Sequence, residues 1–238
     1  MDSQILTSAF RYAARKESKG VVVVRNGYIV GEWYGGGWDE MSRQHGYSVT
    51  KSFTSALVGM LIDYTVFVNE NQVASDFIQE WQNPAHSIVT IENLLSMNSG
   101  LYWDILTDVL LVLSRDQNSY AIGLPMQYLP RVTWVYSNSA TQVISELILS
   151  ATGSQAGVYA LDRLKNVLGM WNATWETDRV HNTLTYAGIV ASAREFAKFG
   201  YLYLREGIWE DQQILSEDWV MESTQPSQSL NPFYGYLW

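Results

Sequence analysis

Ser48 and Lys51 lie three residues apart at the start of a long apolar segment, and Tyr136 and Asn138 follow far downstream. On a helix, side chains three residues apart share one face, with roughly 5–6 Å between their Cβ atoms. A lysine amine at that distance can take the proton of a serine hydroxyl. The spacing therefore predicts Ser48 as a nucleophile, with Lys51 and Tyr136 in place of the more common histidine. A helix cap beside a solvated lysine is the plainer alternative for this pair.

The apolar run from Ala56 to Val68, interrupted only at positions 63 to 65, predicts that Lys51 opens a buried helix. Ser48 would then lie in the first turn of that helix. Free backbone N–H groups and the positive end of the helix dipole favour a developing alkoxide there, and they disfavour a protonated lysine.

The remaining elements follow from local patterns. Positions 3 to 18 have helical spacing, and residues 21–25 and 28–34 flank Asn26-Gly27, a strong hairpin signal. From Lys51 to about Phe199 the chain is expected to be mostly helices and loops. The helical segments expected there are 91–97, 141–151, 158–168 and 193–205.

Composition excludes several classes of protein. The 238 residues are 47% hydrophobic and only 16% charged, which indicates a core-rich globular chain. The net charge of −9, with no basic cluster, disfavours nucleic acid as a partner. No apolar stretch reaches the roughly 18 residues that span a bilayer. These observations leave the compartment open: periplasmic or secreted after removal of a signal, or cytoplasmic.

Metal and cofactor sites are not expected. The chain has no cysteine, and its three histidines, His45, His86 and His181, are scattered outside any metal-ligand spacing. The glycine trio at positions 35–37 is better explained as a turn than as a phosphate-binding loop, since no Gly-x-Gly-x-x-Gly pattern occurs. Asp108 and Asp116 fall in a variable stretch and receive no role.

Nearly the whole chain resembles the serine β-lactamase and penicillin-binding-protein superfamily, and more closely its class C β-lactamase, esterase and 6-aminohexanoate-dimer hydrolase branch. The resemblance implies an α/β (α+β) fold of the β-lactamase/transpeptidase type, with an antiparallel sheet flanked by helices and a mostly helical domain. The sheet domain would comprise residues 1–47 and 195–238, and the helical domain residues 48–194. Six segments in the family's order carry the likeness: 21–27, 47–52, 91–101, 136–138, 168–170 and 191–200.

By this resemblance, Ser48 is the acylated nucleophile, Lys51 its proton acceptor and Tyr136 the acid/base for the leaving group. Asn138 would hydrogen-bond both Lys51 and the substrate. Tyr102 and Trp103 fall where related enzymes place a loop beside the active site, and they are candidates for contact with an apolar acyl or amide substrate. Packing in the hydrophobic core is the alternative for these aromatic residues.

The resulting hypothesis is a serine hydrolase for a small-molecule ester or amide, favoured as a carboxylesterase or short-amide hydrolase. A β-lactamase or a D-alanyl-D-alanine carboxypeptidase is the alternative within the same chemistry, because pocket detail rather than fold separates these activities. An inactive fragment or a binding scaffold is the non-enzymatic alternative. The residues leave open whether Lys51 or an anionic Tyr136 is the base.

The family's third active-site motif, Lys-Thr-Gly or His-x-Gly, occurs nowhere in the sequence, and residues 233–238 resemble the stretch that leads into its strand. We therefore expect the sheet to be incomplete at the C-terminus, lacking one oxyanion-hole donor besides the N–H of Ser48. An exposed apolar sheet edge, association with another chain through it and weak activity of residues 1–238 alone would follow.

Overall fold

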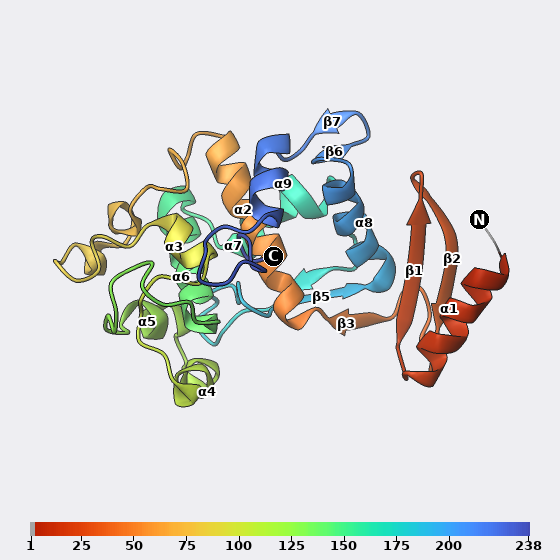
Figure 1. Ribbon diagram of the computed structural model, residues 1–238, viewed down its shortest axis with the longest axis horizontal. Coiled ribbons are helices and arrows are strands. Elements are labelled where there is room, and N and C mark those ends of the chain that lie inside the picture. The colour runs from red at the N-terminus through yellow and green to blue at the C-terminus, as the bar shows by residue number, and fades with distance from the viewer. Residues whose placement is uncertain (1–2) are drawn as a thin grey trace.

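The computed structural model describes residues 3–238, which form a mixed fold of helices and small antiparallel sheets (Figure 1). The helices are α1 (Ser3–Arg15), α2 (Thr50–Asp63), α3 (Ile91–Leu95), α4 (Ile105–Leu113), α5 (Gln117–Ile122), α6 (Asn138–Thr152), α7 (Ala156–Ala160), α8 (Ala193–Leu204) and α9 (Glu217–Thr224). The strands are β1 (Gly20–Arg25), β2 (Tyr28–Tyr34), β3 (Arg43–His45), β4 (Thr174–Trp175), β5 (Ile189–Ser192), β6 (Ile208–Trp209) and β7 (Gln212–Gln213). The mixed α/β class expected from the sequence is confirmed.

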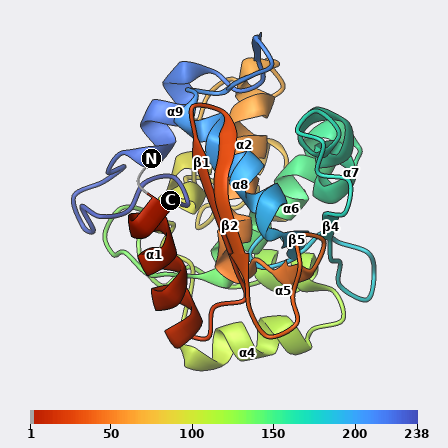
Figure 2. The same cartoon turned by 90° about the vertical axis from the view of Figure 1, so that its right-hand side faces the viewer.

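The N-terminal helix and hairpin form where the sequence predicts them. Asn26 and Gly27 both have positive φ, 51° and 82°, as the tight turn between two twisted strands requires. β1 contacts α8 and β2 contacts α1, and together these elements form a layer at one end of the molecule (Figures 1 and 2). Within the described residues, β1 pairs only with β2, so its other edge carries no strand.

A second sheet has the strand order β3-β5-β4, and its strand β3 ends just before Ser48. Gln44 of β3 lies opposite Ala191 of β5, and Gly46 then donates its N–H to the carbonyl of Ile189 at 2.8 Å. This pairing joins residues 43–46 to residues 189–192, which the sequence assigns to different domains. The division into domains 1–47 with 195–238 and 48–194 remains a prediction.

Helix α2 is the buried centre of the molecule. Eleven of its fourteen residues are buried, as the apolar run predicts. The helix is shorter than the apolar run, since α2 ends at Asp63, where that run is interrupted. Thr65 turns into the left-handed region (φ 58°), and the N–H of Val66 returns to the carbonyl of Leu61, which closes the helix end.

A glycine in α2 lets the C-terminal region pack closely. A Cβ at Gly59 would lie 2.4 Å from Cδ1 of Trp219 in α9. The indole of Trp219 in turn packs on the ring of Tyr236, with 5.5 Å between ring centroids. Residues 225–238 are thereby held against α2 and α3, and the N–H of Leu237 bonds the carbonyl of Leu95.

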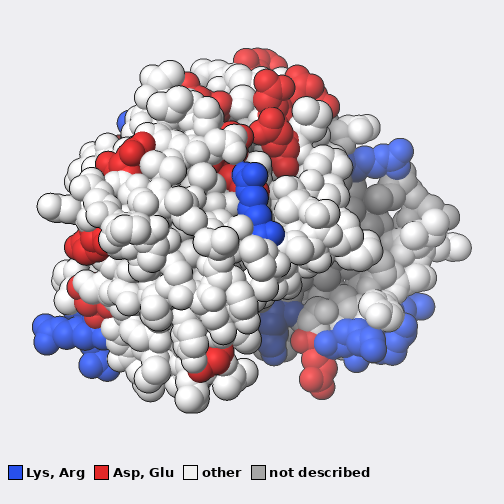
Figure 3. Space-filling view, turned by 60° about the vertical axis from the view of Figure 1, so that its left-hand side comes forward, with Lys and Arg blue, Asp and Glu red and all other residues white. Residues whose placement is uncertain are grey.

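Acidic side chains outnumber basic ones in this chain, 24 Asp and Glu against 15 Lys and Arg. On the face shown in Figure 3, Asp and Glu side chains gather near the top of the view, next to broad uncharged areas. This distribution suits the net charge of −9, and repulsion of nucleic acid remains an expectation. In the part of the chain that the structure describes, no helix is both long and apolar enough to cross a membrane.

Candidate active site

Ser48 lies in a short 3₁₀ turn, Tyr47–Val49, immediately before α2. The prediction that Ser48 belongs to the first turn of the α-helix therefore needs a small correction. Helical dihedrals continue through Val49 and Thr50, so the three-residue spacing still places Ser48 and Lys51 on one face. Tyr47 has a φ of 45°, a costly conformation for a bulky residue, at the point where the chain turns to expose the serine.

Lys51 is buried, with only 1% of its surface exposed. Its Nζ donates to Ser48 Oγ at 3.3 Å, to Asn138 Oδ1 at 2.7 Å and to the carbonyl of Tyr186 at 3.0 Å. Burial lowers the pKa of Lys51 from 10.5 to about 7, against the opposing effect of the Asp108 charge. Because these partners use all three donors of an ammonium, the amine is held in one place beside the hydroxyl.

Tyr136 closes the other side of the serine. Lys51 Nζ lies 4.7 Å from the centroid of its ring. Burial raises the pKa of Tyr136, a hydrogen bond with Ser48 lowers it, and the Asp108 charge raises it further. The phenol thus contacts the serine hydroxyl in its neutral, proton-bearing form near pH 7.

Asn138 is the first residue of α6, and the side chain of Ser137 caps that helix by accepting from the N–H of Ala140. The amide of Asn138 faces two ways: Oδ1 accepts from Lys51, and Nδ2 donates to Asp108 Oδ2 at 3.0 Å. The structure thus brings together Ser48, Lys51, Tyr136 and Asn138, four residues singled out from spacing and resemblance. Their catalytic roles remain proposals.

Asp108, in α4, is a member of this cluster that the sequence did not indicate. Its pKa is raised by burial, and the Trp103 indole, Asn138 and Lys51 lower it. Trp103 lies close enough to influence this carboxylate, although its Nε1 has no well-formed hydrogen bond. Tyr102 instead turns its hydroxyl to Asp104, the N-cap of α4, at 2.7 Å. Substrate contact by Tyr102 and Trp103 stays a prediction.

Two further tyrosines, Tyr186 and Tyr234, lie next to the cluster, and no sequence motif predicts them there. Tyr186 is buried, donates its hydroxyl to Gln117 Oε1 at 2.9 Å, and has a pKa raised to about 12 chiefly by burial. Tyr234 packs edge-on against Tyr136, with 6.2 Å between ring centroids, and against Trp134 at 5.4 Å. The C-terminal segment therefore supplies an aromatic wall beside Tyr136.

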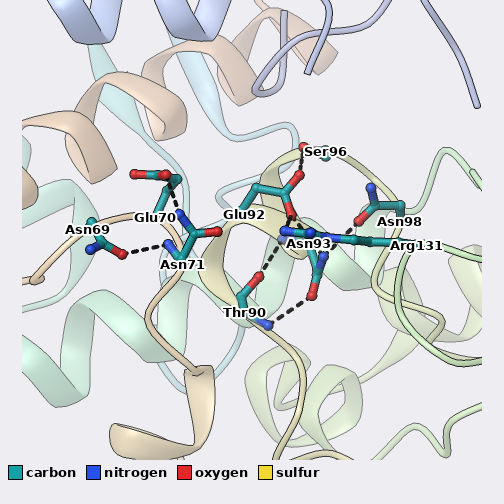
Figure 4. Close-up of polar contacts among 9 residues, drawn as sticks. All are labelled: Asn69, Glu70, Asn71, Thr90, Glu92, Asn93, Ser96, Asn98 and Arg131. Atoms are coloured by element: carbon teal, nitrogen blue, oxygen red, sulfur yellow. Dashed lines mark hydrogen bonds and ion pairs between the residues drawn. The ribbon is translucent and has the colours of Figure 1, made fainter. Parts of the chain in front are cut away.

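The loop that leads to Tyr136 is anchored by a polar network around Glu92 (Figure 4). The buried carboxylate of Glu92 accepts from Ser96, Asn93 and Arg131, each at 2.9 Å. Beyond Arg131 the chain follows the segment next to α3: Val135 donates to the carbonyl of Met97, and the N–H of Ser137 donates to its sulfur. The Glu92 network therefore holds the start of this loop, and the two bonds to Met97 fix the backbone on either side of Tyr136.

His45 and His86 contact residues outside this cluster, although the ring of His45 also packs on Tyr47, next to the serine. His45 is 3.6 Å from Glu176, and His86 contacts Asn83 and the carbonyl of Leu124. Across residues 3–238, no three His, Cys, Asp or Glu side chains are grouped so as to hold a metal ion.

Ser48 Oγ accepts a hydrogen bond from the buried amine of Lys51, in a fold that combines small antiparallel sheets with a largely helical body. The chain belongs to the beta-lactamase family: the family model described as Beta-lactamase matches residues 10–238. Comparison of the sequence with curated proteins gave no match.

Solved structures share the fold. A proposed 6-aminohexanoate-dimer hydrolase from Bacillus anthracis superposes with a TM-score of 0.80 at 24% identity, over 92% of this chain and 64% of that protein. A proposed beta-lactamase from Bacteroides dorei also gives 0.80, at 18% identity over 99% of this chain and 78% of its own. The octameric penicillin-binding protein homologue from Pyrococcus abyssi gives 0.73 at 16% identity, over 100% and 64%. The present chain thus spans about two thirds of the length of the first and third of these proteins.

Proposed function

We propose that the chain is a serine hydrolase that cleaves an ester or a short amide through an acyl-enzyme. The observation that supports this most directly is the 3.3 Å contact between Ser48 Oγ and the buried amine of Lys51. Burial of a lysine that has no carboxylate in direct contact costs free energy, because the charged amine loses its hydration. A catalytic role for Lys51 explains why this cost is tolerated here.

In the first stage, Ser48 Oγ attacks the substrate carbonyl carbon while its proton passes to Lys51 Nζ. The tetrahedral oxyanion is stabilised by the backbone N–H of Ser48. The carbonyl then re-forms, the bond to the leaving alcohol or amine breaks, and Tyr136 delivers a proton to that leaving group. Lys51 returns a proton to Tyr136, so the protons balance. In the second stage, a water molecule attacks the ester carbon of the acylated Ser48 and gives a proton to Lys51. The bond between that carbon and Ser48 Oγ then breaks, Lys51 returns the proton to Oγ, and the carboxylic acid product leaves.

Lys51 suits the role of base better than Tyr136 does. Burial brings the pKa of Lys51 to about 7, so a large fraction of the amine is neutral near pH 7, whereas burial raises the pKa of Tyr136. An efficient general base has a pKa near the working pH. An anionic Tyr136 beside a charged Lys51 is therefore the less favoured of the two assignments, although groups this close titrate together.

The aromatic side chains beside the serine favour an apolar substrate. Tyr136, Trp134 and Tyr234 form a partly buried aromatic wall beside the serine, and aromatic walls of this kind suit acyl groups and short amides. A β-lactamase or D-alanyl-D-alanine carboxypeptidase activity is the second candidate. It is supported by similarity to proteins such as the "Beta-Lactamase/D-Alanine Carboxypeptidase" of Pseudomonas syringae.

Active-site labelling tests the proposal. A fluorophosphonate probe and, separately, a penicillin should acylate Ser48, as peptide mapping by mass spectrometry would show. The matched control is Ser52→Ala. Ser52 lies in α2, four residues after Ser48, and its hydroxyl donates to the carbonyl of Leu237, so this change should leave labelling intact. Absence of label at Ser48 in the folded protein would favour a binding scaffold or an inactive fragment.

A further inference from the structure

A chain of two hydrogen bonds extends from the catalytic cluster to α4. Lys51 Nζ donates to Asn138 Oδ1 at 2.7 Å, and Asn138 Nδ2 donates to Asp108 Oδ2 at 3.0 Å. Asp108 is the fourth residue of α4, whose start is fixed independently by the capping side chain of Asp104. Asp108 therefore does not serve as the helix cap, and its carboxylate is turned toward α6.

The hydrogen bond from Asn138 to Asp108 determines which end of the Asn138 amide faces Lys51. An amide side chain can rotate by 180°, which exchanges its oxygen and its NH₂ group. If Asn138 rotated, its NH₂ would face the amine of Lys51, and a hydrogen bond would become a contact between two donors. An ionised carboxylate only accepts hydrogen bonds, so Asp108 selects the orientation in which Oδ1 faces Lys51.

We propose that Asp108 is a positioning residue, which orients the Asn138 amide toward Lys51 and places a negative charge one side chain away from the amine. This inference rests on the proposed hydrolase function, and it adds a residue that acts through Asn138 rather than on the substrate.

The electrostatic surroundings support the second part of the proposal. Lys51 is faced by Ser48, Tyr136, Asn138 and the carbonyl and ring of Tyr186, and Asp108 is the acidic side chain that acts on its pKa. The titratable groups around Asp108 are Lys51, Tyr136, Tyr186 and Tyr120. The tyrosines are neutral near pH 7 because each has a raised pKa, so the charge that changes with substitution at position 108 is the carboxylate itself.

Two substitutions separate orientation from charge. Asp108→Asn keeps an acceptor oxygen for Asn138 and removes the charge, while Asp108→Ala removes both. Glu80→Gln, a change of the same charge at an exposed position, is the control. The rate of Ser48 labelling by a fluorophosphonate is measured against pH for each protein.

For Asp108→Asn we expect the inflection of the labelling rate to move to lower pH by about one unit, with the rate at high pH little changed, because loss of a nearby negative charge favours the neutral amine. For Asp108→Ala we expect the same shift together with a fall of about tenfold in the rate at high pH, since Asn138 then loses the acceptor that holds its NH₂ group away from Lys51. Glu80→Gln should match the wild type.

A second readout does not depend on labelling. The chain has five lysines, so ¹³Cε-lysine NMR can follow the titration of Lys51 directly, with Lys51→Arg identifying its signal. Unchanged titration of Lys51 in Asp108→Asn, or equal loss of thermal stability in both variants with no shift of either inflection, would show Asp108 to be only a brace between α4 and α6. If wild-type Ser48 is never labelled, the proposed function fails, while the NMR titration still decides the effect of Asp108 on Lys51.

Discussion

Lys51 Nζ donates a 3.3 Å hydrogen bond to Ser48 Oγ from a side chain that is only 1% exposed. Serine and lysine are both abundant on protein surfaces, where such a contact is no evidence of catalysis. Here burial lowers the pKa of the lysine, so that a neutral amine is available as an acceptor for the serine proton. The predictions below follow from this contact and from the elements that hold it.

The first prediction concerns the cluster itself. Ser48→Ala should abolish ester hydrolysis and leave the thermal unfolding temperature nearly unchanged, because Ser48 is exposed. Lys51→Ala and Tyr136→Phe should each lower turnover by about 10²–10⁴-fold, the usual effect of losing a general acid or base. Steady-state assays on purified proteins measure these changes. Retention of more than a few per cent of turnover by Ser48→Ala would show that another residue is the nucleophile.

The second prediction is the pH dependence of the reaction. Lys51 must be neutral to accept a proton, and its pKa is about 7. Activity should therefore be highest above pH 7 and fall about tenfold for each unit below it. The measurement is kcat/KM between pH 5 and 9 with an ester that does not itself titrate in this range. An activity that rises as the pH falls below 7 would rule out Lys51 as the base.

The third prediction is that Lys51→Met stabilises the fold. The folded-state pKa of Lys51 is lower than its unfolded value of 10.5, so the unfolded chain binds the proton more tightly, and burial of the amine is most unfavourable below pH 7. This penalty shrinks as the pH rises from 7 toward 10.5. The gain in unfolding free energy should be about 3 to 5 kcal/mol at pH 6 and clearly smaller at pH 9.

Urea titration at the two pH values measures the gain, with exposed Lys19→Met as the control. Equal effects of Lys51→Met at pH 6 and pH 9 would contradict a lowered pKa in the folded state.

The fourth prediction concerns specificity. Because the serine lies beside the aromatic wall of Tyr136, Trp134 and Tyr234, short-chain p-nitrophenyl esters should be turned over faster than nitrocefin. Comparison of the two kcat/KM values on one preparation tests this. A clear preference for nitrocefin would move the assignment to a β-lactamase.

The fifth prediction concerns the edge of β1 that carries no strand in residues 3–238. Unpaired strand edges promote association, so the apparent mass in light scattering should rise with concentration. Successive N–H groups of a strand point to opposite sides, so Val21→Pro and Val22→Pro form a matched pair: one removes an N–H that faces β2, the other an N–H on the open edge. The substitution that removes the N–H on the open edge should suppress association without loss of stability. The substitution that removes the N–H facing β2 should destabilise the hairpin. A constant monomer mass at all concentrations would refute the prediction.

The sequence predicts local elements and the contact between Ser48 and Lys51, because helical spacing alone brings those two side chains together. The pairing of Asn138 with Lys51 was expected only from the family resemblance, since 86 residues separate the two positions. Asp108 could not be predicted, because a single acidic residue in an apolar helix belongs to no pattern. Likewise, β3 and β5 are too short for their alternation to be recognised, and the end of α2 uses Thr65 where a glycine or asparagine would be the usual signal.

Gly59 has a consequence for the tolerance of this fold to change. A glycine inside a helix is ordinarily a place where alanine improves stability. Here the added methyl group would occupy the space of the Trp219 ring, which packs on Tyr236, two residues from the Tyr234 that borders Tyr136. A single added carbon atom in the core would thus disturb the packing that leads to Tyr136, so the helix that carries Lys51 keeps a glycine, its weakest helix-forming residue, at this position.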